Sequence, residues 1–342
     1  MTGIAIVGTG MWAPRLAGAA ARAGLELVAC FSRDEARRRD FAERFGCEPA
    51  ATFEDAVGHP RVEGVLLVTP NDIHEEHALA CAERGRHVFV EKPIADSLDA
   101  AERMRRACAE AGVTLMVGHA FRRLGAARRV KELIHEGALG RVVLAEANMT
   151  LPGTFKPEAW RAQRDRNRGG PIMQLGIHHV DTLAYWLGPV RRASGRFAHV
   201  HTHAEIDDVG VVTLEFESGA LATVTGSYVS PKTLSLRLFG SEAVLELRTD
   251  FSVWPDARAL DGATELTLGG EPVAFEARDM LAEELAEFGR CIRGEAEPET
   301  GAKEGIAALR AVLAALDSDA ELPPGRAHAA VNAPGARAEA AS

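Results

Sequence analysis

Two histidines and an aspartate stand close together in the stretch GGPIMQLGIHHVD, residues 169–181. Histidine has an unperturbed pKa of about 6.5, so it suits proton transfer or metal ligation near neutral pH. Neighbouring residues on a helix point about 100° apart, so His178 and His179 cannot both face one small site. We predict that Gln174, His178 and Asp181 share one polar helix face and that His179 packs behind it.

A metal site is the competing interpretation of these histidines. His178, His179 and Asp181 could ligate a divalent ion, and the histidines of HVHTH, residues 199–203, alternate as on one face of a strand. A zinc site needs three or four converging ligands. Because the sequence has no further His/Cys cluster of suitable spacing, we predict no metal, and we expect HVHTH on an exposed strand face or an oligomer surface.

A glycine pattern follows the first apolar run of the chain. In IAIVGTGMWA, Gly8 allows a tight turn, Gly10 lets the backbone approach a pyrophosphate, and Ala13 lets the next helix pack closely. The free N–H groups at the start of that helix would face the phosphates. An ordinary strand–helix turn is the alternative. The predicted cofactor loop comprises Gly8, Thr9, Gly10, Met11 and Trp12.

The end of the second apolar run, CFSRD, bears on the choice of dinucleotide. An acidic residue at this position binds the ribose 2′-hydroxyl of NAD, but Ser32 and Arg33 stand here instead. A hydroxyl and a guanidinium suit a 2′-phosphate, so we predict NADP as the favoured cofactor and NAD as the alternative. Asp34 is expected to cap the next helix. A solvated surface charge is the other interpretation of Arg33.

The motif VFVEKP places Glu91, Lys92 and Pro93 at the end of another apolar run. Doubly wound sheets bind their ligands at the carboxyl ends of the strands, so a lysine here points towards a ligand. Pro93 restricts Lys92 to extended geometry and can form a cis bond. A surface lysine in a turn is the alternative interpretation.

The elements that would position these residues alternate over the first 120 residues. Apolar runs (GIAIVG, LELVACF, GVLLVTP, HVFVEKP and TLMVGH) are separated by helical patterns at 15–23, 35–45, 74–84 and 98–111, the last capped by Ser97. Runs that are apolar on both faces indicate a parallel sheet covered on both sides. We predict an α/β Rossmann domain, a doubly wound parallel sheet, over residues 1–122.

The pattern of apolar residues along the sequence changes near residue 141. Strand pairs are expected at 209–228 and 234–247, around Ser-Gly and Gly-Ser turns, with helices at 173–187, 279–292 and 302–316. We predict an α+β domain with an open, mostly antiparallel sheet over residues 123–323. Residues 324–342, rich in alanine, proline and glycine, are expected to be disordered.

Bulk properties exclude several classes of function. The formal net charge of −10 argues against nucleic-acid binding. No apolar run approaches the ~20 residues that cross a bilayer, and no signal peptide precedes the first run. The cysteine count of 5 is odd and no CxxC spacing occurs, so we expect a reduced, cytoplasmic protein.

The motifs GTGMWA, TPNDIHEEHA, VEKPIA and GGPIMQLGIHHVD, in this order, resemble the Gfo/Idh/MocA oxidoreductase family over residues 3–320. These are relatives of glucose–fructose oxidoreductase and inositol dehydrogenase. The resemblance implies hydride transfer between a nicotinamide and a secondary alcohol or ketone of a sugar, polyol or related small molecule. It also implies a homodimer or homotetramer formed through the open sheet. A glycosidase that retains its NAD and a cofactor-binding regulator are the alternatives on this fold.

The resemblance also implies roles for individual residues. Lys92 would lie near the nicotinamide and the reacting oxygen, and His178 would be the acid/base. Gln174 stands where many relatives have aspartate, and glutamine binds hydroxyls but carries no proton. The predicted catalytic residues are therefore Lys92, His178 and Gln174, and Asp181 joins them in binding substrate. Further cofactor contacts are implied for Thr69, Pro70, Asn71, His74, Glu91, Lys92, Pro93, His119, Arg122, Trp160 and Arg161.

Overall fold

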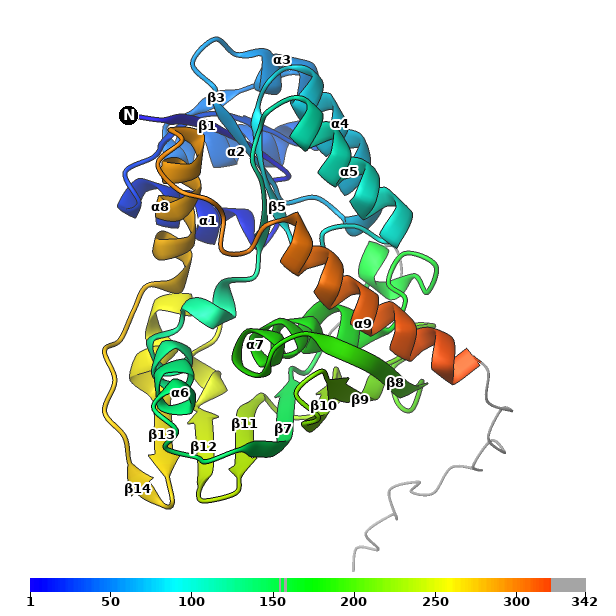
Figure 1. Ribbon diagram of the computed structural model, residues 1–342. Helices are drawn as coiled ribbons and strands as arrows, with labels where there is room; N and C mark the ends of the chain where they lie inside the picture. The colour runs from blue at the N-terminus through cyan, green and yellow to red at the C-terminus, as the bar shows by residue number, and fades with distance from the viewer. Residues whose placement is uncertain (154, 157–158, 321–342) are drawn as a thin grey trace, which may run out of the picture.

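The computed structural model describes residues 1–153, 155–156 and 159–320, which form two sheets with helices packed between and around them (Figure 1). The predicted disordered tail, 324–342, lies outside the described residues. No helix in the described ranges is long and apolar enough to cross a membrane.

The first sheet is parallel throughout, with strand order β3-β2-β1-β4-β5-β6. Helices cover both of its faces, so the predicted doubly wound fold is confirmed. Its strands are β1 (Gly3–Val7), β2 (Glu26–Phe31), β3 (Glu48–Pro49), β4 (Gly64–Leu67), β5 (His87–Glu91) and β6 (Leu115–Gly118), and its helices are α1 (Ala13–Arg22), α2 (Glu35–Phe45), α3 (Phe53–Gly58), α4 (His74–Glu83) and α5 (Leu98–Glu110).

Two predicted helix caps are confirmed: Asp34 accepts the N–H of Arg37 at 3.0 Å, and Ser97 accepts that of Ala100 at 3.3 Å. β3 and α3 were not predicted from the sequence. A strand of 2 residues and a helix of 6 are too short to show a hydrophobic period.

The second sheet has strand order β14-β13-β12-β11-β7-β10-β9-β8. Among the described strands of this sheet, β7 and β10 are the one neighbouring pair that runs parallel, and the other pairs are antiparallel. The predicted open, mostly antiparallel sheet is confirmed. Both predicted strand pairs, β9–β10 and β11–β12, are present. The strands are β7 (Val142–Thr150), β8 (Val190–Ala198), β9 (Val209–Phe216), β10 (Leu221–Ser227), β11 (Thr233–Gly240), β12 (Val244–Thr249), β13 (Thr264–Leu268) and β14 (Glu271–Pro272).

The helix that carries the two histidines is not regular along its length. It begins as a π-helix, η4 (Ile172–Gly176), and continues as α7 (Ile177–Leu187). A π-turn holds more residues than an α-turn, so the face shared by positions 174 and 178 differs from the one an α-helix predicts. Single π-turns of this kind occur frequently at functional sites.

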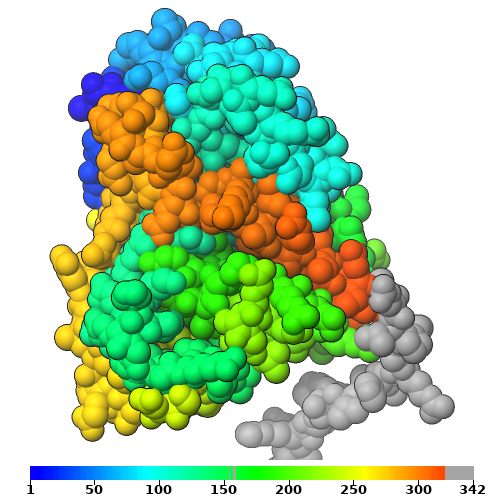
Figure 2. Space-filling model, viewed as in Figure 1, coloured from blue at the N-terminus to red at the C-terminus, as the bar shows by residue number. Residues whose placement is uncertain are grey.

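The last two helices return to the first sheet. α8 (Met280–Ile292) packs on β4 so closely that a Cβ at Gly64 would lie 2.7 Å from Ile292 Cδ1. α9 (Ala302–Ala320) lies between the upper and lower parts of the molecule, as the orange-red band of Figure 2 shows. A Cβ at Gly305 of α9 would lie 2.7 Å from Val117 Cγ2 on β6. The body around the first sheet therefore includes residues far beyond 122, and the predicted division at that residue stays a prediction.

Shorter elements connect these layers. α6 (Gly125–His135) and the 3₁₀ turn η2 (Ala120–Arg123) lead from the first sheet to the second. The remaining 3₁₀ turns are η1 (Asn71–Ile73), η3 (Trp160–Ala162), η5 (Phe251–Val253), η6 (Ala257–Ala259) and η7 (Asp261–Ala263).

Candidate active site

The glycine loop after β1 has the geometry of a phosphate cradle. Gly8 has φ +94°, and a Cβ there would lie 2.5 Å from the Val68 carbonyl oxygen, so only glycine fits. At Gly10 an added Cβ meets nothing within 4 Å, which leaves this backbone open to a ligand. α1 then begins at the buried Ala13 without a side-chain cap. The loop therefore fits a pyrophosphate bound at a helix N-terminus.

The residues that follow β2 lie beside this loop. Thr9 Oγ1 donates a hydrogen bond to Ser32 Oγ at 2.8 Å. Arg33 is exposed and pairs with no carboxylate among the described residues, whereas Arg37 pairs with Asp34 and Arg39 with Glu35. Arg33 is therefore available to an anionic ligand in a way that the neighbouring arginines are not.

His74 joins two of the predicted cofactor loops. Its ring nitrogens lie 2.9 Å from the Thr69 carbonyl oxygen and 3.1 Å from that of Pro93. Burial lowers the pKa of His74 to about 4. Because the ring is fully buried and faces these carbonyls, His74 holds the two loops together, and its expected contact with the cofactor stays a prediction. The Lys92–Pro93 peptide, in the second of these loops, is cis.

Two further residues of the loop after β4 belong to this region. Asn71 is buried in η1, and the hydroxyl of Thr69 is buried without a partner in the described structure. A buried polar atom without a partner marks a place where a ligand group can bind. Pro70, which lies between them, is partly exposed.

Lys92 lies at the centre of the site. Its Nζ donates to the main-chain carbonyl oxygen of Gln174 at 2.7 Å, so the π-turn and the end of β5 meet directly. Burial lowers the pKa of Lys92 to about 8, and the adjacent Glu91 carboxylate opposes this effect. At neutral pH the lysine is therefore mostly an ammonium group that gives up its proton readily.

Polar atoms without partners surround this lysine. Nδ1 of His178 and Nε2 of Gln174 are both buried and unpartnered within the described structure, and the His178 ring packs on Phe121 with centroids 4.4 Å apart. Burial holds the pKa of His178 well below its usual value, and the charge of Lys92 adds to the effect. His178 is therefore neutral at neutral pH and able to accept a proton.

His119, at the end of β6, lies in the same region. Both of its ring nitrogens are buried without a partner in the described part of the chain. Burial lowers the pKa of His119 to about 4. The charge of Asp181 opposes this effect, whereas the charges of Arg122 and Lys92 add to it. This imidazole is thus a second neutral group behind the lysine.

Arg122 and Asp181 form a buried ion pair with one another. Nε and Nη2 of Arg122 donate to the two carboxylate oxygens of Asp181 at 2.9 and 2.5 Å. Both oxygens accept from Arg122, so the pair holds α7 against the end of β6. The substrate contact expected for Asp181 and the cofactor contact expected for Arg122 stay predictions. His179 is buried and faces the Asn148 carbonyl oxygen at 3.2 Å, which confirms that it is a packing residue.

The segment around Trp160 approaches the cofactor loops from the second sheet. Arg161 lies over the Trp160 ring, 4.4 Å from its centroid. Arg166 makes a bidentate ion pair with Asp72 of η1, both hydrogen bonds being 3.0 Å long. This contact was not predicted from the sequence, because no local signal links residues 94 positions apart.

The expected HVHTH strand is wrong. β8 ends at Ala198, and the chain then turns around the carboxylate of Asp208, which accepts the N–H groups of residues 200, 201 and 202 at 2.7–2.8 Å. The buried carboxylate binds backbone groups that a strand would need for its ladder. In the described ranges, no group of three or more His, Cys, Asp or Glu residues could hold a metal ion.

The parallel sheet, the glycine loop and the lysine–histidine site define an oxidoreductase with a dinucleotide-binding Rossmann domain. Residues 2–119 match the family model described as an oxidoreductase family with an NAD-binding Rossmann fold, and residues 127–246 match the GFO/IDH/MocA C-terminal domain. The chain belongs to the Gfo/Idh/MocA oxidoreductase family, and its cofactor is NAD(P). The resemblance seen in the sequence is confirmed.

Curated relatives and a solved structure agree with this assignment. The D-xylose 1-dehydrogenase (NADP(+)) 2 of Haloferax volcanii is 30% identical, over 86% of this chain and 89% of the relative. The D-xylose 1-dehydrogenase [NADP(+)] of Haloarcula marismortui is 28% identical, over 92% of this chain and 90% of the relative. An oxidoreductase of Desulfitobacterium hafniense, provisionally named as NADPH-dependent, has a TM-score of 0.90 and 36% identity, covering 94% of this chain and 96% of that one.

The glycine loop generates the first testable prediction. Gly10→Ala places a methyl group in the open cradle without touching protein, so it should weaken cofactor binding about tenfold or more while unfolding is little changed. Gly8→Ala is the contrasting variant, because its φ and its contact with Val68 should cost about 1–3 kcal/mol of stability. Thermal unfolding and cofactor titration measure both effects. Unchanged affinity in Gly10→Ala would place the phosphates elsewhere.

Proposed function

We propose that the protein transfers hydride between NADP and a secondary alcohol or ketone of a sugar or polyol. The observation that carries this proposal is the contact of Lys92 Nζ with the π-turn that precedes His178. It brings a cation and a neutral imidazole to one place at the carboxyl edge of the first sheet. The unpartnered amide of Gln174 supplies a third group that can bind a substrate hydroxyl.

His178, Lys92 and Gln174 each have a separate role in the proposed reaction. In the oxidative direction, neutral His178 takes the proton of the substrate hydroxyl. The Lys92 ammonium orients that oxygen and stabilises the negative charge that develops on it. Gln174 binds a neighbouring hydroxyl but carries no proton, so His178 passes its proton to water. A nicotinamide dinucleotide held by the glycine loop would supply the acceptor for the hydride that leaves the carbon bearing the reacting oxygen.

The relatives guide the choice of substrate class. The two haloarchaeal proteins described above are named as dehydrogenases of D-xylose, so their names describe oxidation of a sugar. This favours net oxidation or reduction over the glycosidase that retains its cofactor and over the regulator. Uncharged polar groups such as Gln174 and His178 also suit a substrate rich in hydroxyls.

Lys92→Ala and His178→Ala test the proposed chemistry. Each should lower kcat/KM roughly 10²- to 10⁴-fold, because each removes a group that acts on the reacting oxygen. Wild-type activity should fall as the pH rises through about 8, where Lys92 loses its proton. Steady-state kinetics with NADP and a sugar and polyol panel measure both effects. The exposed Lys303 and His135 provide matched alanine controls. Full turnover by Lys92→Ala would refute the mechanism.

The choice of NADP rests on Ser32 and Arg33. Arg33 has no competing carboxylate in the described structure, and Thr9 orients the Ser32 hydroxyl. A guanidinium binds a phosphate through two parallel hydrogen bonds, whereas the ribose hydroxyl of NAD prefers a carboxylate at this position.

Titration of Arg33→Ala tests this choice. Its NADPH affinity should fall about 10- to 100-fold, the value of a charge-assisted hydrogen bond, while NADH affinity changes less than about threefold. Arg37→Ala is the matched control, because Arg37 already pairs with Asp34. Quenching of the intrinsic tryptophan fluorescence measures both affinities. A wild-type preference for NADH would refute the assignment of the 2′-phosphate.

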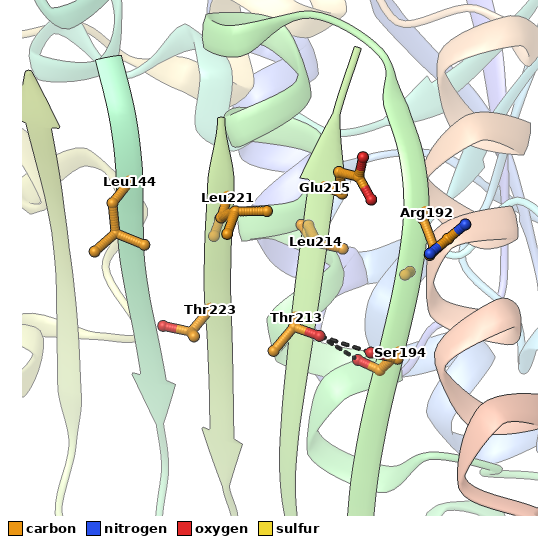
Figure 3. A pocket seen from close by; sticks show the side chains of 10 residues that line it. Leu144, Arg192, Ser194, Thr213, Leu214, Glu215, Leu221 and Thr223 are labelled. Atoms are coloured by element: carbon orange, nitrogen blue, oxygen red, sulfur yellow. Dashed lines mark hydrogen bonds between the residues drawn. The ribbon is translucent and has the colours of Figure 1, made fainter. Parts of the chain in front are cut away.

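We also propose that the open face of the second sheet binds a second copy of the chain. Leu144 and Leu221 lie opposite each other on β7 and β10, and both line a hollow of about 330 Å³ (Figure 3). Leu221 is 53% exposed and Val211 is 41% exposed, which is unfavourable for a face in water. Sedimentation at the mass of a single chain, 36.6 kDa, at micromolar concentration would contradict this assembly.

A further inference from the structure

The indole of Trp12 is held on three sides. Its ring stacks on Trp254, with centroids 5.3 Å apart and planes 23° apart. The guanidinium of Arg15 lies 5.3 Å from the ring centroid. The indole Nε1–H donates to Glu91 Oε1 at 2.5 Å. Trp12 thus joins the cofactor loop, the segment after η5 and the residue next to Lys92.

The Glu91 carboxylate has two further close neighbours, Gly118 and the main chain of Lys92. Gly118 lies opposite Glu91 in the pairing of β5 with β6, and a Cβ there would be 3.1 Å from Glu91 Oε1. The second carboxylate oxygen, Oε2, accepts the main-chain N–H of Lys92 at 3.2 Å. Oε1 is thus held by the Trp12 N–H next to Gly118, and Oε2 by the main chain of Lys92, so the carboxylate has little freedom to turn.

Several charges act on this pair of residues. Burial raises the pKa of Glu91, while the Lys92 ammonium and the Trp12 N–H favour its ionised form. Burial lowers the pKa of Lys92, which Glu91 opposes and Arg161 reinforces. His119 and His178 also face the lysine, and Glu284 faces Glu91 from α8. The state of Glu91 therefore bears directly on the lysine.

We infer that Trp12 is a positioning residue for Lys92. Its indole N–H, held in place by the stack on Trp254, fixes the orientation of the Glu91 carboxylate, whose other oxygen accepts the main-chain N–H of Lys92. The inference deepens the proposed function, because it assumes that Lys92 acts on the reacting oxygen. It follows that the loop that binds the cofactor also adjusts the charge of the residue that acts on the substrate.

The test measures the titration of Lys92 directly. The chain has only five lysines, Lys92, Lys131, Lys156, Lys232 and Lys303, so labelling lysine Cε with ¹³C gives five signals. The Lys92→Arg variant identifies the Lys92 signal, and its shift with pH in the full-length protein gives the midpoint. This readout needs no substrate and no turnover.

Trp12→Phe keeps an aromatic ring against Trp254 but removes the N–H donor. We expect it to lower the Lys92 midpoint by about half a pH unit or more, because a Glu91 carboxylate that the indole N–H no longer holds in place supports the ammonium less. Glu91→Gln should lower it by about one unit or more, and adding Trp12→Phe to Glu91→Gln should change nothing further. An unchanged midpoint in folded Trp12→Phe, or additive effects in the double variant, would overturn the inference.

Trp186→Phe is the matched control. It also removes one indole hydrogen bond, from Nε1 to the Ala127 carbonyl oxygen at 3.0 Å, but it lies in α7 away from Glu91. Its Lys92 midpoint should equal that of the wild type, and an equal fall would overturn the inference. If Trp12→Phe does not fold, Trp254→Leu tests the same contact by removing the stack, and it should lower the midpoint in the same direction.

The two proposals fail separately. If Trp12→Phe lowers the midpoint while the wild type oxidises no sugar or polyol, the positioning role stands and the proposed function is wrong. If the wild type is active and the midpoint does not move, the positioning role alone is wrong. In an active enzyme, Trp12→Phe should also move the alkaline limb of the pH profile to lower pH and reduce kcat more than it raises the KM of the sugar.

Discussion

Two neighbouring buried arginines connect the parts of the molecule on which the site depends. Arg122 pairs with Asp181 of α7, and Arg123 pairs with Glu284 and Glu287 of α8 at 3.2 and 3.0 Å. Buried charges must be matched, and removing one partner of such a pair typically costs several kcal/mol. Because both arginines follow β6 directly, the helix that carries His178 and the helix that returns to the first sheet are aligned to the same strand end.

This arrangement explains how a site forms between residues far apart in the chain. α7 is held at the carboxyl edge of the first sheet, so its preceding π-turn presents a carbonyl oxygen to Lys92. The polar atoms left without partners, on Gln174, His178 and His119, gather around that contact. Groups that are buried and neutral bind hydroxyls without the cost of desolvating a charge, which suits an uncharged polyol or sugar.

Two side-chain contacts connect the second half of the chain to the loops of the first sheet. Trp254 stacks on Trp12 at one point, and Arg166 pairs with Asp72 at another. Both contacts link the second half of the chain to loops that follow strands of the first sheet. These contacts therefore hold the second half of the chain against the loops in which we propose that the cofactor binds.

The sequence by itself determined five strands of the first sheet, all but β3, and the loops that follow them. Apolar runs alternating with helical patterns carry the β–α order, and GxGxxA and EKP mark the strand ends where ligands bind, because these signals are local. Tertiary structure decided the partners. The sequence shows that Asp181 is polar and on the helix face of His178, but not that its carboxylate pairs with Arg122, 59 positions away. The alternation in HVHTH predicts a strand, yet its main-chain N–H groups bind the carboxylate of Asp208 instead of a neighbouring strand. Periodicity tells which face of an element is buried, but not which residue lies opposite it, and that depends on how distant segments pack.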